Sequence, residues 1–129
     1  MIFSLAIYAS PSSQSSHSAY HFACELLKQG HSLYRVFFYH DAVNIGSTLS
    51  APPQDEANQT ARWQALSQEY SLDLVVCIAA GLRRGILDAK EAERYDKPAY
   101  NLADTFELSG LGQLVDATVH SDRLITFGH

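Results

Sequence analysis

Runs of apolar residues alternate along the chain with segments in which apolar residues recur at helical spacing. Apolar runs bounded by turn-forming residues are typical of buried strands, and the second pattern is typical of amphipathic helices. The runs predict strands at residues 2–9, 31–39, 72–80, 99–102 and 123–127. The helical spacing predicts helices at about residues 16–29, 55–70, 87–95 and 108–119.

This alternation predicts a single domain over residues 1–129, because neither a linker nor an internal repeat interrupts it. Strands that alternate with helices form mainly parallel sheets that are covered on both faces. We therefore expect an α/β fold, a three-layer α/β/α sandwich with a mainly parallel five-stranded sheet. Residues 41–54 contain glycine, serine and proline without periodicity, and they predict a long irregular connection of a kind that is commonly functional or mobile.

The strand expected at residues 72–80 carries the first candidate for chemistry. Its unbroken apolar run favours burial on both faces, and Cys77 lies in the second half of that run. Open parallel sheets place their chemistry beyond the carboxyl ends of the strands, where N–H groups of a following helix point back at the site. Arg83 and Arg84 follow closely, so a thiolate at Cys77 is expected to be stabilised by amides and by positive charge. The alternative for both arginines is a surface role at the start of a helix.

The two cysteines also have plainer explanations. Free cysteine is among the most buried residue types, so Cys77 is equally well explained as a small core residue. Cys24 lies three residues after His21 and seven after His17, and these three side chains could in principle hold zinc. The sequence offers no evident fourth ligand, so a solvated helix face explains this group better, and no metal site is expected.

Composition narrows the possible functions. The net charge of -5 and the absence of any block of Lys and Arg argue against a direct nucleic-acid binder. No basic segment precedes the short apolar start, so we expect no signal peptide, no membrane span and a cytoplasmic location. Two cysteines in a reducing compartment are better explained as thiols than as a disulfide. The serine-rich turn after the first strand lacks glycine, so the dinucleotide fingerprint and the P-loop pattern are absent. A serine-lined anion site is one interpretation of this turn, and solvated loop serines are the simpler one.

A resemblance to the DsrE family of sulfur-relay proteins is carried by the residues around Cys77. The central segment of the family's thiol-bearing TusD-type subunits resembles residues 62–85, R-W-Q-A-L-S-Q-E-Y-S-L-D-L-V-V-C-I-A-A-G-L-R-R-G. The combination of C-x-A-A-x-x-R-R-G with S-G-L-G at residues 109–112 is specific. Residues 31–43 and 122–127 resemble other parts of the family, so the likeness spans nearly the whole chain.

The resemblance implies a DsrE-like fold and a sulfurtransferase that works through a cysteine persulfide. The family's reactive cysteine falls on Cys77, nothing matches Cys24, and Arg83 and Arg84 become candidates for stabilising the thiolate or persulfide. A TusA-like donor would load Cys77, and a TusE-like acceptor would take the sulfur toward 2-thiolation of the wobble uridine of tRNA. The implied neighbours are TusB-like and TusC-like subunits, in a heterohexamer of two heterotrimers. Persulfide exchange needs an accessible thiolate but no metal and no redox cofactor, and a downstream enzyme would hold the tRNA.

Two other functions remain open at this point. A DsrE-type subunit would run the same relay in dissimilatory sulfur oxidation, and neighbouring genes of that pathway would identify it. A non-catalytic oligomerisation or ligand-binding module would keep Cys77 in its core, and a buried, unreactive thiol would favour it.

Overall fold

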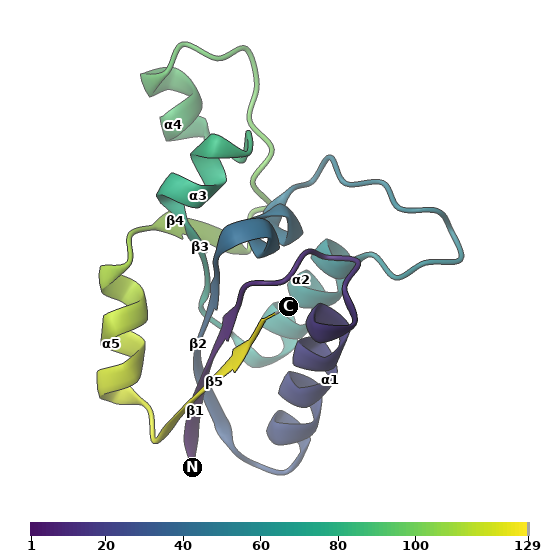
Figure 1. Cartoon of the computed structure of the whole chain (residues 1–129), viewed down its shortest axis with the longest axis vertical. Coiled ribbons are helices and arrows are strands. Elements are labelled where there is room, and N and C mark those ends of the chain that lie inside the picture. Colours follow the sequence, from purple (N-terminus) through teal and green to yellow (C-terminus); the bar gives the residue numbers. More distant parts are fainter. Residues whose placement is uncertain (129) are drawn as a thin grey trace.

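Five strands form one parallel sheet in the computed structural model, which describes residues 1–128 (Figure 1). The order across the sheet is β4-β3-β2-β1-β5, and each pair of neighbouring strands runs parallel. The predicted parallel five-stranded sheet is confirmed. The strands are β1 (Ile2–Ile7), β2 (Ser32–Phe38), β3 (Leu74–Cys77), β4 (Phe106–Ser109) and β5 (Arg123–Phe127).

Helices cover both faces of the sheet, which confirms the α/β/α sandwich. Figure 1 shows α1 and α2 on one face and α5 on the other. Phe38 of β2 packs edge to face on Trp63 of α2, with ring centroids 5.5 Å apart. Arg35 of β2 instead donates to Asp116 of α5 over 2.8 Å, on the opposite face. The helices are α1 (Gln14–Lys28), α2 (Gln59–Tyr70), α3 (Ile78–Arg83), α4 (Ala89–Arg94) and α5 (Gly112–His120), and η1 (His40–Gly46) is a 3-10 helix.

The turn between β1 and α1 is built by serine side chains. Ser13 caps α1, because its hydroxyl accepts a hydrogen bond of 3.2 Å from the backbone N–H of Ser16. The hydroxyl of Ser16 is buried and donates over 2.9 Å to the carbonyl of Ala9. These two serines therefore position the start of α1, whereas Ser12 in the same turn is exposed, as expected of a solvated loop.

Arg35 fastens α5 to the sheet. Its guanidinium donates to the carboxylate of Asp73, to that of Asp116 and to the carbonyl of Gln113, at 2.8, 2.8 and 2.9 Å. The register shift between β1 and β2 leaves Tyr34 without a partner on β1, and its hydroxyl also donates to Asp116, over 2.7 Å. These polar contacts add to the apolar packing of α5, in which Ala117 is buried and Leu114 lies against the core.

Two predicted strands differ from the structure. The strand expected at residues 99–102 does not form, since Leu102 makes only an isolated antiparallel bridge with Ser47. β4 lies instead at Phe106–Ser109, and α5 begins at Gly112 rather than near residue 108. The strand expected at 72–80 ends at Cys77, because α3 begins at the next residue.

The connection at 41–54 is also more regular than predicted, since η1 occupies its first part. No helix within residues 1–128 combines the length and the apolar character needed to cross a membrane.

Candidate functional site

Cys77 lies where β3 ends and α3 begins. It is the last residue of β3 and the N-cap of α3, and no side-chain hydrogen bond caps that helix. The thiol is free of any disulfide, and the residue is only 2% exposed. The sequence therefore placed Cys77 correctly at the carboxyl end of a central strand. In the isolated chain, however, it is part of the core.

The alternation of side chains along β3 puts Cys77 on the face that carries α5. Val76 pairs with Phe38, which packs against α2, so Val76 shares that face and Cys77 takes the other. Cys77 pairs with Ser109 of β4. On its other side, β3 pairs with β2, and the last pair of that register is Phe38 with Val76.

Aromatic rings line this end of β2. The ring of His40 stacks on that of Tyr39 with centroids 4.3 Å apart, and the ring of Tyr8 lies 5.5 Å from Tyr39. His40 also holds a positive φ of 49°, which is uncommon outside glycine. The sequence alone did not single out Ser109 as a neighbour of Cys77, because that pairing depends on strand order and register.

The two candidate arginines lie at the opposite end of α3 from Cys77. At about 1.5 Å of rise per residue, Arg83 is roughly 9 Å along the helix axis from the thiol-bearing residue. Arg83 is exposed, whereas Arg84 donates to Asp41 and to the carbonyl of Ala80, both over 3.1 Å. Arg84 thereby ties α3 to η1. The guanidinium of Arg84 nevertheless turns back along α3, because the carbonyl that it contacts belongs to Ala80, three residues after Cys77.

The second cysteine is not part of a ligand cluster. Cys24 is half-buried on α1, and His17 on the same helix lies 3.3 Å from the side-chain amide of Gln59 through its Nδ1 atom. Within residues 1–128, no three His, Cys, Asp or Glu side chains come together in a way that could hold a metal ion.

A cavity of about 580 Å³ lies elsewhere, between the β1–α1 turn and the start of α2. Its lining includes Ser12, His17, Asn58 and Gln59, but not Cys77 or either candidate arginine. The thiol site and this cavity are therefore separate features of the carboxyl edge of the sheet.

Comparison with known proteins places the chain in a family. The model of the DsrE/DsrF-like family matches residues 1–127. The chain belongs to the DsrE/DsrF-like family. Among curated relatives, the DsrE protein of Allochromatium vinosum is 50% identical over 129 residues, which cover 99% of each chain. A protein named sulfurtransferase TusD homolog, from Pseudomonas aeruginosa, is 46% identical over 99% of this chain and 98% of its own length.

A third relative, the sulfurtransferase TusD of Erwinia tasmaniensis, is 49% identical and covers 89% of this chain and 90% of its own length. The crystal structure of the YchN protein from E. coli has the same fold, with a TM-score of 0.75, 23% identity and coverage of 98% and 97%. The family and its sulfurtransferase relatives agree with the resemblance seen around Cys77.

Proposed function

We propose that this DsrE/DsrF-like protein is a sulfur carrier and sulfurtransferase that holds its cargo on Cys77 as a persulfide. The observation that carries the proposal is the place of Cys77, at the carboxyl end of a central parallel strand in a chain whose close relatives are named sulfurtransferases. Such strand ends are where parallel sheets bring reactive groups to their edge.

The transfer step needs no oxidant and no cofactor. The Cys77 thiolate attacks the outer sulfur of a donor persulfide, a sulfur–sulfur bond forms at Cys77, and the donor's own sulfur–sulfur bond breaks. The electron pair of the broken bond leaves with the donor cysteine as a thiolate. Onward transfer repeats the step with Cys77 as the leaving group. Since Cys77 is 2% exposed, each transfer requires that a partner move the segments covering it.

A TusA-like donor and a TusE-like acceptor are the proposed partners, with 2-thiolation of the tRNA wobble uridine as the destination in the cytoplasm. Intact-protein mass spectrometry tests the proposal after incubation with a cysteine desulfurase, cysteine and the TusA-like donor. We expect one added sulfur atom, which a reductant removes.

The similarity to DsrE of A. vinosum favours dissimilatory sulfur oxidation as a second destination of the sulfur. If deletion of the gene abolishes the tRNA modification, that result would argue against this second destination.

The burial of Cys77 favours another candidate, a non-catalytic oligomerisation or ligand-binding module with the thiol in its core. A chain that takes up no sulfur from the donor, alone or with its partner subunits, would support that candidate.

We propose a long-range role for Arg83 and Arg84 in stabilising the thiolate or persulfide. Replacing both by Gln should slow alkylation of Cys77 by about two-fold at low ionic strength, and by less at high salt, because salt screens the attraction between the guanidinium groups and a thiolate. The control is Lys28→Gln with Arg123→Gln, which removes the same charge from exposed sites on other elements. Equal alkylation rates in all three proteins at low salt would show that the arginines serve only the fold or a partner.

We also propose that the chain assembles with TusB-like and TusC-like subunits into a heterohexamer of two heterotrimers. One face of α5 carries an exposed apolar stripe made by Leu111, Val115 and Val119, which are 47%, 62% and 72% exposed. Contiguous exposed apolar residues of this kind mark protein–protein contacts. Light scattering on the co-expressed set should report a hexamer, and Val115→Asp should lower the mass. A strictly monomeric chain, alone and in the co-expressed set, would contradict this assembly.

A further inference from the structure

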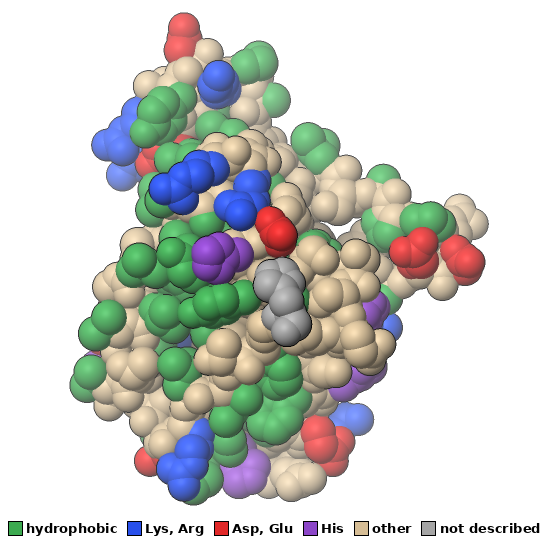
Figure 2. All heavy atoms as spheres, viewed as in Figure 1, with side chains coloured by type: hydrophobic (Ala, Val, Ile, Leu, Met, Phe, Trp, Pro, Cys, Tyr) green, Lys and Arg blue, Asp and Glu red, His purple; other side chains and the backbone are tan. Residues whose placement is uncertain are grey.

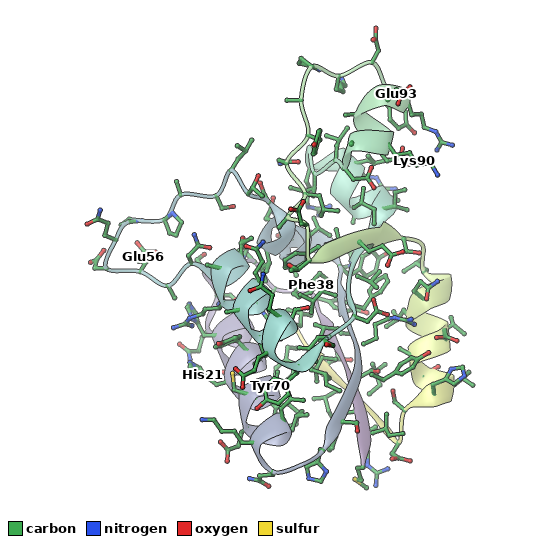
Figure 3. The ribbon with its side chains drawn as sticks, turned by 180° about the vertical axis from the view of Figure 1, so that it is seen from behind. His21, Phe38, Glu56, Tyr70, Lys90 and Glu93 are labelled. Carbon is green, nitrogen blue, oxygen red and sulfur yellow. The ribbon has the colours of Figure 1, made fainter. Side chains whose placement is uncertain are left out.

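The connection between β3 and β4 forms an arm that projects from the sandwich. We define the α3–α4 arm as residues 78–100, which contain both helices (Figure 1). Residues 93–100 are all exposed, and α4 buries only Glu91 and Ala92. Figure 3 shows Lys90 and Glu93 on α4, well clear of the layers in which Phe38 is buried. The first part of the arm is packed, since Ala80 and Ile86 are buried, and its far part is open to solvent.

The base of the arm is clamped. The side-chain oxygen of Asn101 accepts from the backbone N–H of Leu87 over 3.0 Å, and the backbone N–H of Asn101 donates to the carbonyl of Leu87, also over 3.0 Å. The side-chain amide of Asn101 donates to the hydroxyl of Ser47 over 3.0 Å. At the other end of the arm, Arg84 binds Asp41. The arm is therefore held at both ends against the body while its far part remains open to solvent.

Exposed charges are unevenly divided between the arm and the rest of the chain. Within residues 1–128, the exposed charged side chains of the arm are four cations and two carboxylates: Arg83, Lys90, Arg94 and Lys97, with Glu93 and Asp96. Elsewhere two cations and seven carboxylates are exposed: Lys28 and Arg123, with Glu25, Asp55, Glu56, Glu69, Asp104, Glu107 and Asp122. Figure 2 shows blue side chains gathered over α3 and α4. The arm is the cationic part of an otherwise anionic surface.

The arm also offers two aromatic anchors. Tyr95 and Tyr100 are 52% and 59% exposed. Tyrosine and arginine are enriched at protein–protein interfaces, where a ring buries apolar area and its hydroxyl keeps a polar partner. The arm therefore combines a fixed base, two exposed tyrosines and local positive charge. These are the features expected of a docking surface for an acidic protein.

We propose that the α3–α4 arm docks an acidic protein that exchanges sulfur with Cys77, an inference that rests on the proposed function. α3 begins directly after Cys77, so the arm starts at the thiol-bearing residue and a protein bound to it is joined to that residue by one short helix. The carboxylates elsewhere on the chain repel an acidic partner, which leaves the arm as the favourable approach and fixes the orientation of docking. A nucleic acid fits less well, because its extended phosphate backbone would meet the anionic remainder of the surface.

The test is the rate of sulfur loading from the persulfidated TusA-like donor, with Lys90→Glu plus Lys97→Glu as the variant. These two substitutions spare Arg94, which pairs with the buried Glu91, and the arginines of α3. The matched control is Lys28→Glu plus Arg123→Glu, which makes the same change in net charge. At low ionic strength the arm variant should load about ten-fold more slowly than the control, and the two should converge near 1 M salt. Tyr95→Ser with Tyr100→Ser should slow loading at every salt concentration.

The outcomes distinguish a failure of the proposed sulfur-carrier function from a failure of the proposed docking surface. A wild-type chain that takes up no sulfur contradicts the proposed function itself. A wild type that loads while both charge-reversal variants load at equal rates overturns only the docking surface. An arm variant that loads normally but loses binding to tRNA, or changes its mass in native mass spectrometry, would assign the arm to nucleic acid or to a second subunit instead.

Discussion

Replacing Cys77 by serine is expected to abolish sulfur loading, whereas replacing Cys24 by serine leaves loading at the wild-type level. A hydroxyl cannot form a persulfide, and only Cys77 stands at a strand end among residues brought together by the sheet. Cys24 is half-buried on α1, away from the β3–β4 pair. Intact-protein mass spectrometry after incubation with desulfurase, cysteine and donor measures the added sulfur directly.

The two variants serve as controls for each other, since each keeps one thiol and changes one sulfur atom to oxygen. Thermal melting should show both folded, because serine fits where cysteine did and costs at most the burial of one hydroxyl, about 1–3 kcal/mol at Cys77. Loading that persists in Cys77→Ser and disappears in Cys24→Ser would move the site to α1.

Replacing Arg35 by methionine is expected to be among the most destabilising single changes to this fold. The Arg35 side chain is 10% exposed and neutralises Asp73 and Asp116, whose side chains are 38% and 37% exposed. Removing one partner of such a network leaves the other charges uncompensated, so the free energy of unfolding should fall by roughly 2–4 kcal/mol. Urea denaturation monitored by circular dichroism measures this loss. Arg123→Met, at an exposed site, should change stability by less than about 0.5 kcal/mol.

The same network predicts how stability depends on pH. Hydrogen bonds from Tyr34 and then from Arg35 lower the pKa of Asp116 below its ordinary value of 3.8. A carboxyl whose pKa is lower in the folded state stabilises the fold above its unfolded pKa, and this contribution is lost as the pH falls through the folded value. Asp116→Asn should therefore flatten the decline in stability below about pH 4.

The Arg35→Met prediction has its own contradicting outcome. An Arg35→Met protein as stable as the wild type would show that α5 is held by apolar contacts alone.

Much of the fold follows from local pattern. The predicted strand at 123–127 coincides with β5, and the strands predicted at 2–9 and 31–39 contain β1 and β2. The fourth strand was misplaced because apolar residues after Pro98 look like a strand start, whereas Asn101 there closes the arm with side-chain hydrogen bonds. A four-residue β4 directly before Gly110 resembles the beginning of the next helix when no partner strand is known.

The boundary between β3 and α3 could not be predicted from the sequence pattern either. A continuous apolar run does not distinguish a buried strand from a strand followed by a buried helical turn. Ile78, Ala79 and Ala80 belong to α3 but are all apolar, so they continue the apolar run of β3 in the sequence. The residue type of Cys77 and its place near a strand end were predictable, but its burial and its neighbour Ser109 required the pairing of β3 with β4.

The burial of Cys77 also bears on how long a loaded chain keeps its cargo. Small thiols such as glutathione are abundant in reducing compartments, and an exposed persulfide would be discharged by them through the same exchange chemistry. With only 2% of Cys77 exposed, such molecules lack a path to the sulfur unless the covering segments move. If docking of the correct protein provides that movement, the fold itself limits wasteful release and couples discharge to recognition.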